Sequence, residues 1–483
     1  RIGGCLRSEE ITLPGYLHDV MAATFVLFLT SPAYGELAGD LAQEGLEFCH
    51  SPYPTAVLRP DGSHAILAMD RAANRVAFDA LHPGDGAQHL RDVQGIEADA
   101  EFLFALLGAP LWSGATARLM LKQAWRRGLT GLKAWMGEAL QPARGWLETG
   151  YGGAQVQALW APWVLHCGLT PESSYSGQMG RVIAFALEAA GAPVVKGGAA
   201  AAAEALGRII TKNGGEIETG CDVARILQSK NRAAGVELAD GGRIKGASVI
   251  ASVTPSQLYG RLLPQDLAPE PVKSFRHGRG NFQLHYALDA PPDWQVPELA
   301  DVALIHLADG IDSVSKSANE AERGMLPEVP TLCLGQPHRL DPSRCPEGKA
   351  ILWVQVPDAP RRIKGDAAGV IPCTPDWSEA LREAFADRIE AILAQHIKNF
   401  ARIKLARRAY APSDLEALNM NLVGGDPYGG ACSLDQFFLW RPFPQSVNNG
   451  TGLKDLYLIG ASTHPGPGLG GGSGYNLAKR MGA

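Results

Sequence analysis

The spacing of apolar residues predicts helices and short strands that alternate near both ends of the chain. Residues 199–213 are rich in alanine and precede Gly214-Gly215, which predicts a helix that ends at a left-handed glycine. Short runs of β-branched or alternating apolar residues follow and predict strands at 216–219, 222–228, 234–238 and 247–252. The last of these has the continuous apolar character of a buried parallel strand.

A different pattern occupies the middle of the chain. Several prolines between residues 264 and 297 accompany a new alternating strand at 281–288, and a charged helix is predicted at 378–401. At the far end, a strand at 456–459 leads through a glycine-rich loop into a helix that we expect to continue to Ala483. This arrangement predicts a discontinuous first domain made of residues 1–50, 191–262 and 445–483, and a second domain made of residues 51–190 and 263–444.

Residues 118–140 form a separate amphipathic segment. Leu121 and Trp125 recur near helical spacing with Lys122 between them, while Gly128 weakens any long helix. Two interpretations remain open: a helix that lies on a membrane surface, and a surface helix whose tryptophans pack inward. No apolar run reaches the ~20 residues that a spanning helix needs. We therefore expect a cytoplasmic protein, with peripheral membrane contact through residues 118–140 as the open alternative.

Composition narrows the class of protein. The 483 residues include 44 basic and 50 acidic side chains, and the net charge of −6 disfavours nucleic-acid binding. The eight cysteines form no C-x-x-C pair, so we expect reduced thiols rather than a redox dithiol or a zinc knuckle. The twelve histidines show no paired ligand spacing and no G-x-S-x-G motif is present, so neither a metal site nor a hydrolase is predicted.

The 56 glycines are about 12% of the chain, against the usual ~7%, and their strongest concentration is at residues 460–474. A strand that leads through glycines into a helix lets the backbone approach a flat or phosphorylated ligand, and helix N–H groups favour negative charge there. On a flavin, the N1/C2=O edge needs such an environment. His464 is the ionisable side chain expected near the ring, either as a proton relay or as a brace for the loop.

Several shorter pieces accompany this loop and together carry a resemblance. They are Arg1-Ile2-Gly3-Gly4, Lys196-Gly197-Gly198, the strand around Val223, Gly424-Gly425-Asp426-Pro427-Tyr428, Ser433-Leu434-Asp435-Gln436 and Thr463-His464-Pro465-Gly466. On these pieces the chain resembles the flavin-dependent phytoene desaturase and amine oxidase superfamily, most closely its branch of pyridine nucleotide-disulfide oxidoreductase domain-containing proteins. The resemblance extends over essentially the whole chain.

The resemblance implies an α/β fold in which an α+β substrate domain is inserted into a Rossmann-like FAD-binding domain. It also implies which residues contact FAD. These are Arg1, Gly3 and Gly4 near the diphosphate and ribityl chain, Val223 at the adenine, Gly460 and Ala461 on the diphosphate and ribityl side, and Leu469, Gly470, Gly471 and Gly472 under the flavin ring. Ala461 stands where many relatives carry an acidic residue.

The family's G-x-G-x-x-G turn and the strands around it have no counterpart here, so we expect the first βαβ unit to be missing. The implied reaction is hydride transfer between FAD and a C–H bond of a small apolar or amine-type substrate, with His464 as the candidate catalytic residue. A non-catalytic scaffold or regulatory role is the alternative. The oligomeric state is left open.

Overall fold

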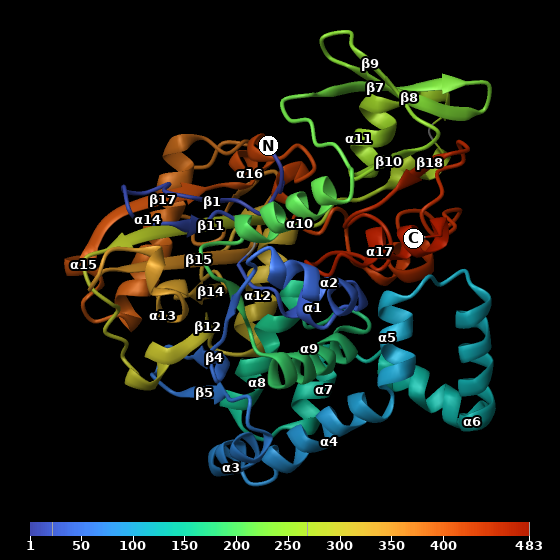
Figure 1. Cartoon of the computed structure of the whole chain (residues 1–483). Helices are drawn as coiled ribbons and strands as arrows, with labels where there is room; N and C mark the ends of the chain where they lie inside the picture. The colour runs from blue at the N-terminus through green and yellow to red at the C-terminus, as the bar shows by residue number, and fades with distance from the viewer. Residues whose placement is uncertain (22, 268, 483) are drawn as a thin grey trace.

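A seven-stranded sheet forms the centre of the fold (Figure 1). The computed structural model describes residues 1–21, 23–267 and 269–482. The strand order is β17-β11-β15-β14-β12-β4-β5, and neighbouring strands are antiparallel except for β12 and β4. The strands are β4 (Tyr53–Leu58), β5 (His64–Leu67), β11 (Gly280–Leu288), β12 (Val302–Leu307), β14 (Leu332–Gly335), β15 (Ala350–Ala359) and β17 (Lys404–Tyr410).

The two faces of this sheet are packed differently. Even-numbered residues of β11 point into an apolar core shared with α14 (Glu379–His396), where Phe385 and Leu393 are fully buried. The alternate residues face the N-terminal segment, and His285 lies against His18 there. The strand predicted at 281–288 is confirmed. The helix predicted at 378–401 is confirmed as far as His396, beyond which α15 (Phe400–Ile403) is a separate turn.

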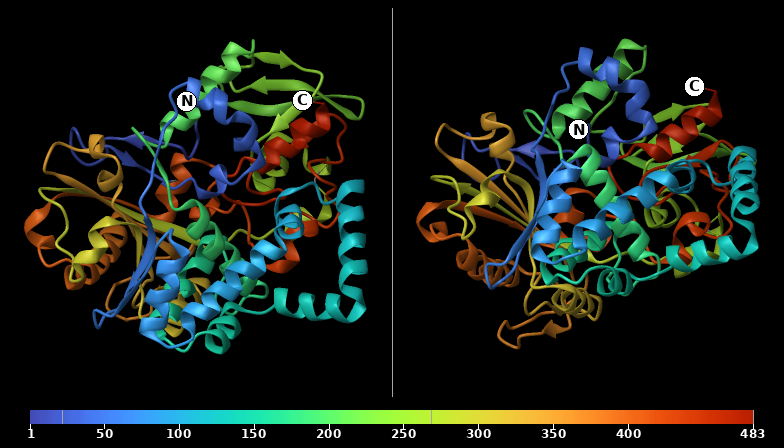
Figure 2. Two further views of the ribbon diagram at one scale, coloured as in Figure 1. Left: turned by 60° about the horizontal axis from the view of Figure 1, so that its bottom comes forward. Right: turned by 90° about the horizontal axis from the view of Figure 1, so that it is seen from below.

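A layer of helices covers the opposite face of the sheet beside β4 and β5 (Figure 2). Trp146 and Trp160 are buried in this layer, whereas Trp112 and Trp125 are exposed. The tryptophans therefore divide between core and surface. The helices are α3 (Arg71–Leu81), α4 (Asp85–Ala98), α5 (Ala100–Gly108), α6 (Gly114–Ala139), α7 (Ala143–Gly150), α8 (Ala154–Trp160), the 3-10 helix η1 (Ala161–Cys167) and α9 (Ser176–Ala190).

The three segments predicted to form the first domain meet in a smaller region. Strand β10 (Val249–Ala251) pairs in parallel with β18 (Leu456–Leu458), and α2 (Pro32–Gln43) packs against α10 (Ala200–Lys212) and α17 (Gly472–Met481). An antiparallel sheet of β7 (Val223–Ser229), β8 (Arg232–Leu238) and β9 (Arg243–Lys245) projects beside them. The predicted helix at 199–213 and the strands at 222–228, 234–238, 247–252 and 456–459 are confirmed, with small shifts at their ends. The domain limits remain a prediction.

Three predicted elements differ from the structure. Residues 216–219 form no strand, because they are exposed and pair with no strand in the described part of the chain. Helix α17 ends at Met481, where Gly482 adopts a left-handed φ of 97°; Ala483 lies outside the described residues. The helix predicted at 118–140 is broken at Gly128, whose φ of 63° and ψ of 173° divide α6 into two arms.

The remaining elements are short. They include β1 (Ser8–Glu9), β2 (His18–Asp19), α1 (Val26–Leu29), β3 (Phe48–Cys49), β6 (Val194–Val195), α11 (Pro255–Gln257), α12 (Ile311–Glu322), β13 (Met325–Leu326), α13 (Pro337–Leu340), β16 (Gly365–Asp366) and α16 (Pro412–Leu418). Among the described residues, no helix has both the length and the apolar character needed to cross a bilayer.

Candidate flavin site

The glycine-rich loop after β18 leads into an uncapped helix start. Gly460 and Gly471 have φ values of 100° and 66°, in a region that residues with a Cβ rarely adopt. Gly471 is the N-cap of α17, and no side chain of the described residues caps the helix. Because the first N–H groups of a helix lack intrahelical partners, those of α17 can donate to an electron-rich or anionic group that approaches this end of the helix.

The loop has both packed and open glycines. A Cβ on Gly466 would lie 2.9 Å from Phe437, and one on Gly468 would lie 2.5 Å from Leu27, so these positions are closed by the protein itself. A Cβ on Gly470 or Gly471 would meet nothing nearer than 3.6 Å. Open backbone at the start of a helix fits the approach of a flat ring such as a flavin.

Ser473 braces the loop from inside. Its buried hydroxyl oxygen lies 2.6 Å from the hydroxyl oxygen of Thr463 and accepts hydrogen bonds from the N–H of Gly460, at 3.3 Å, and the amide of Asn449, at 3.1 Å. One side chain thus ties the first turn of α17 to both the beginning and the middle of the loop.

Arg441 braces the loop from outside. Its Nε and Nη2 atoms donate to the carbonyl oxygen of Ala461 at 2.9 and 2.8 Å, and Nη2 also donates to that of Tyr428 at 2.6 Å. The side chain is only 3% exposed. Hydrogen bonds with an ionised donor are stronger than neutral ones, so Arg441 fixes the position of Ala461 firmly.

His464 makes a third brace. Its Nε2 lies 2.9 Å from the carbonyl oxygen of Ala109, and because a carbonyl only accepts, Nε2 carries the proton. Burial, with a smaller contribution from Arg441, lowers the pKa of His464 to about 4, so the ring is neutral near pH 7. Nδ1 then presents a lone pair and has no hydrogen-bond partner in the described part of the chain. His464 therefore holds the loop through its Nε2 hydrogen bond to Ala109, and its Nδ1 remains available as a hydrogen-bond acceptor.

The N-terminal motif lies against α10. A Cβ on Gly3 would be 2.7 Å from the carbonyl oxygen of Leu6 and 3.1 Å from Ala203, so a tight turn and a close helix approach both require glycine. Gly4 is more open, because a Cβ there would lie 3.7 Å from its nearest neighbour, the side-chain nitrogen of Asn419. The exposed side chain of Arg1 forms an ion pair with Glu9.

Two residues expected to contact FAD, Leu469 and Val223, pack in hydrophobic clusters with other parts of the predicted first domain. Leu469 packs with the hydrophobic cluster formed by residues 25–48 and α10, the helix that also contacts Gly3. Val223 begins β7 and packs in another cluster with Leu458, two residues before Gly460. Leu469 therefore packs with the N-terminal segment and α10, whereas Val223 packs with the end of β18.

The sequence pattern gave no indication of a polar stripe across the large sheet. Strand register places residues from β4, β12, β15 and β11 on the face opposite the aliphatic core. Buried atoms of this row that have no hydrogen-bond partner among the described residues include Thr55 Oγ1, His306 Nδ1, Trp353 Nε1, Gln283 Oε1, Asn281 Oδ1 and both ring nitrogens of His285. Buried polar atoms are normally paired, so this row is where water or the polar group of a ligand is expected. A small cavity beside His285 has space for about one water molecule.

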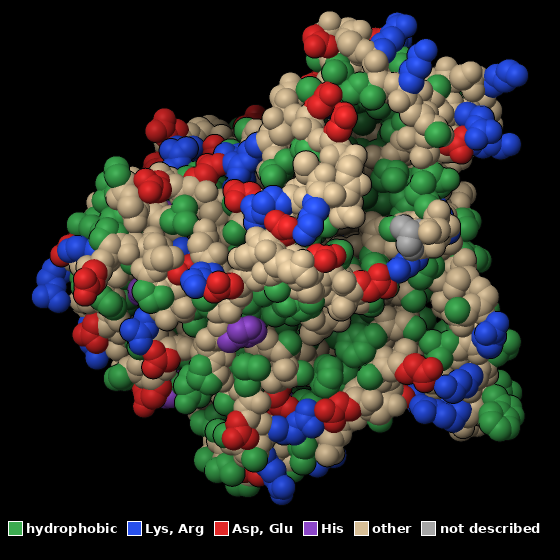
Figure 3. Space-filling view, in the orientation of Figure 1, with side chains coloured by type: hydrophobic (Ala, Val, Ile, Leu, Met, Phe, Trp, Pro, Cys, Tyr) green, Lys and Arg blue, Asp and Glu red, His purple; other side chains and the backbone are tan. Residues whose placement is uncertain are grey.

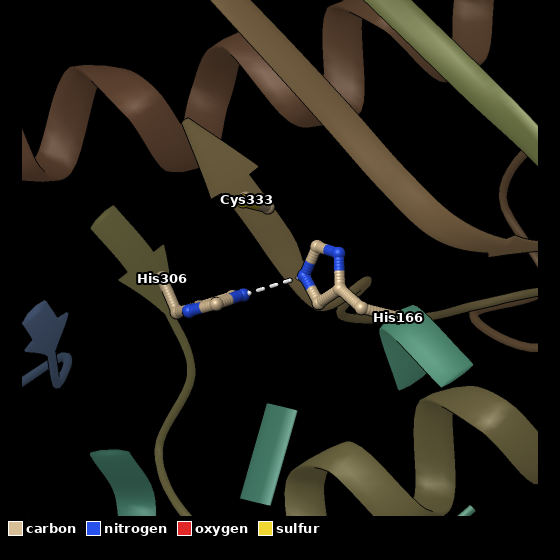
Figure 4. Close-up of side chains that lie close together, drawn as sticks. All are labelled: His166, His306 and Cys333. Atoms are coloured by element: carbon tan, nitrogen blue, oxygen red, sulfur yellow. Dashed lines mark hydrogen bonds between the residues drawn. The ribbon is translucent and has the colours of Figure 1, made fainter. Parts of the chain in front are cut away.

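The same face contains a cluster of His166, His306 and Cys333 (Figure 4). The Nε2 atoms of the two histidines are 3.0 Å apart, and the three potential ligand atoms lie within 4.8 Å of one another. Two imidazoles and a thiolate would suit a soft metal ion. However, burial lowers the pKa of His166 to about 4 and raises that of the Cys333 thiol, which favours a neutral hydrogen-bonded pair beside a protonated thiol. Sequence spacing missed the cluster because each residue comes from a different element.

Asp426 and Asp435, which belong to two of the motifs that carry the resemblance, have structural partners. The buried carboxylate of Asp426 accepts hydrogen bonds from the backbone N–H groups of Gly278, Tyr428 and Gly430 at 2.8 Å. Asp435 pairs with Arg276 at the surface. Asp426 therefore organises a turn. The cysteines are free thiols in the structure, and of these Cys333 and Cys432 are buried.

Comparison with known proteins gives a family match over most of the chain. The profile of the family described as flavin containing amine oxidoreductase matches residues 67–468. Mouse pyridine nucleotide-disulfide oxidoreductase domain-containing protein 2 is 28% identical over 298 residues, which are 59% of this chain and 50% of the mouse protein. The match thus spans about half the length of that relative. A limonene dehydrogenase subunit of Castellaniella defragrans is 24% identical over 511 residues, covering 99% of this chain and 88% of that protein.

Two further comparisons concern a carotenoid enzyme and the fold. The zeta-carotene-forming phytoene desaturase of Myxococcus xanthus is 26% identical over 281 residues, 57% of this chain and 49% of that protein. Among solved structures, a putrescine oxidase variant has a TM-score of 0.58 at 12% identity and covers 100% of this chain and 90% of its own. Cyclohexylamine oxidase from Brevibacterium oxydans has a TM-score of 0.52 at 14% identity, with 100% and 92% coverage.

These matches establish the class of protein. An open glycine loop ends at an uncapped helix start, and the overall α/β fold is similar to that of a solved putrescine oxidase and a solved cyclohexylamine oxidase. The family profile covers most of the chain. The chain belongs to the flavin containing amine oxidoreductase family, and FAD is the cofactor that this family match implies.

Proposed function

We propose that this chain removes hydride from a C–H bond of a small apolar or amine-type substrate. The observation that carries the proposal is the open backbone of Gly470 and Gly471 at the uncapped start of α17. When bound, FAD supplies a ring that accepts hydride at N5.

The protein's own contribution on the cofactor side is position and charge. The N–H groups of α17 would hold the pyrimidine edge of the ring, which gains negative charge on reduction. Leu469 to Gly472 would lie under the ring, Gly460 and Ala461 beside the ribityl chain, and Val223 at the adenine. Gly3 and Gly4 would lie near the diphosphate, where Arg1 would exchange Glu9 for phosphate.

On the substrate side, the protein has two tasks. Apolar packing excludes water from the transferred hydride, and the buried polar stripe on the sheet orients any hydrogen-bonding group that the substrate carries. The free Nδ1 of His464 would be available to accept a hydrogen bond near the proposed ring position. The relatives named for limonene and phytoene support an apolar substrate, whereas the structural neighbours named for amines support an amine.

A substitution at Gly470 tests the site directly. Because a Cβ there would make only an ordinary contact, 3.6 Å from the carbonyl oxygen of Leu27, Gly470→Val should fold normally but place its side chain where the ring is proposed to lie. FAD titrated into the purified chain, which we expect to retain it only weakly, should give the visible absorbance of bound oxidised flavin, and the variant should bind it at least about tenfold more weakly. Gly95→Ala, at an open position in α4, is the control and should bind FAD as the unaltered chain does. A colourless chain that takes up no added FAD would refute the proposal.

The substrate class is then found by reduction of the flavin. Anaerobic mixtures with detergent-dispersed terpenes and polyenes, and separately with primary amines, should bleach the flavin for one class and leave it oxidised for the other. Bleaching by neither class would count against hydride removal from such substrates.

A further inference from the structure

The segment from Trp112 to Leu140, which we name the α6 elbow, has most of its large apolar side chains outside, although Trp135 packs inward against Phe102. Trp125 is 90% exposed, Leu129 84% and Leu121 71%, and all three lie around the break at Gly128. The buried side chains of α6 are polar, namely Thr116 and Gln123. A surface helix of a soluble protein normally has the opposite arrangement, so this exposed apolar face is built for a partner.

The α6 elbow is also basic in an acidic protein. It contains five basic residues and one acidic residue, whereas the chain as a whole has a net charge of −6. Lys122, Arg126 and Arg127 pair with carboxylates of residues 99 and 101, while Arg118 and Lys133 form no ion pair within the described ranges. Figure 3 shows basic and hydrophobic side chains together at the lower right, over the elbow.

Hydrogen bonds fasten the base of the α6 elbow to the flavin loop region. Asn476 of α17 donates to the carbonyl oxygen of Gly108 at 2.7 Å, and His464 donates to that of Ala109 at 2.9 Å. The side chain of Asn448 exchanges two hydrogen bonds with the backbone of Trp112, at 3.2 and 3.3 Å. The elbow is therefore attached to the rim of the proposed flavin site.

We propose that the α6 elbow docks on an anionic lipid bilayer and holds the rim of the flavin site at its surface. Each arm is shorter than the ~20 residues of a membrane span, so the elbow would lie within the interface. Tryptophan at the outermost position and basic side chains around it match the chemistry of that interface. The docking itself does not depend on the reaction; delivery of an apolar substrate from the bilayer rests on the proposed function.

A second copy of this chain is a poorer occupant for the α6 elbow. In a twofold dimer the same surface patch meets itself, so the basic residues of one elbow would face those of the other. An acidic lipid surface instead neutralises them. Charge complementarity therefore favours the bilayer.

Vesicle flotation of the full chain, reconstituted with FAD, tests the proposal. We expect binding to phosphatidylcholine vesicles that contain phosphatidylglycerol, weaker binding to pure phosphatidylcholine, and a blue shift of tryptophan emission on binding. The double variant Trp125→Ser/Leu129→Ser should bind anionic vesicles roughly tenfold more weakly, because it removes the inserted apolar surface. Arg118→Gln/Lys133→Gln should weaken binding about thirtyfold on anionic vesicles and little on neutral ones.

Val370→Ser is the matched control, because Val370 is 73% exposed elsewhere on the protein, and it should bind like the unaltered chain. Absence of vesicle binding, or equal loss of binding in the Val370 variant, would overturn the proposal. So would a dimer in solution that Trp125→Ser/Leu129→Ser dissociates without any vesicle binding. Flotation is read from protein rather than flavin, so failure of docking and failure of FAD binding are separate results.

Discussion

Replacing Arg441 by methionine should loosen the flavin loop measurably. The substitution keeps the side chain long and apolar but removes the donors to the carbonyl oxygens of Ala461 and Tyr428. Each buried carbonyl left unpaired costs about 1–3 kcal/mol. Part of this cost is offset because the variant no longer buries a cation. We therefore expect a net loss of about 3 kcal/mol of unfolding free energy.

The assay combines thermal unfolding with FAD titration. An unfolding entropy of ~2.1 cal/mol/K per residue gives about 1 kcal/mol/K for a chain of 483 residues that unfolds as one unit, so Tm should fall by roughly 3 °C. The Kd for FAD should rise at least about tenfold, because the displaced Ala461 lies beside the proposed ribityl position. Arg441→Lys keeps the charge but not the planar fork and should lie between the two proteins.

Arg276→Met is the control for this experiment. Arg276 pairs with Asp435 at the surface, where removal of an ion pair costs less than about 1 kcal/mol. Its Tm and FAD affinity should stay close to those of the unaltered chain. If Arg441→Met also left both quantities unchanged, the hydrogen bonds of Arg441 would not be what holds the loop.

Three further predictions address other parts of the structure. Burial lowers the pKa values of His18 and His338 to about 4. The folded state therefore has its full stability above pH 6.5 and loses about 3 kcal/mol for each histidine as pH falls from 6.5 to 4. When Tm is measured against pH, it should fall less steeply over this range in His338→Leu than in the unaltered chain. Gly3→Ala places a Cβ 2.7 Å from another atom at a φ of 96° and should lower the free energy of unfolding in urea by about 2–4 kcal/mol. Gly197→Ala, at a φ of 74° with no atom near the new Cβ, should lower it by only about 1 kcal/mol. Equal losses of unfolding free energy would show that the contact at Gly3 does not matter. Ser473→Ala should lower Tm and weaken FAD binding together, and a change in only one of them would contradict its role as a brace.

Local patterns predicted much of the secondary structure correctly. The alanine-rich helix α10, strand β11 and the passage from β18 through glycines into α17 depend on backbone preferences and periodicity within a few residues. Prediction failed at residues 216–219, where the alternation of β-branched residues with glutamate suggested a strand. A strand needs a neighbour to pair with, and local sequence does not say whether one is present.

The braces of the candidate site could not be predicted in this way. Nothing in the local sequence distinguishes Arg441 from the other arginines. Only the fold places its Nε 2.9 Å from the carbonyl oxygen of Ala461. The pairing of His166 with His306 and the polar stripe on the sheet likewise join residues far apart in sequence. Spacing rules detect ligands on one element, whereas these groups come from several.

The sequence by itself determined where backbone must be free of side chains, because glycine is required wherever φ is positive or another chain segment approaches closely, as at Gly3 and Gly471. It also placed tryptophan and basic residues along one segment. Only the tertiary structure decided that the Nε2 of His464 donates its hydrogen bond to the carbonyl oxygen of Ala109, and that Trp125 is exposed while Gln123 is buried. The physical reason is that burial and hydrogen-bond partners are properties of the packed chain, which local preference does not contain.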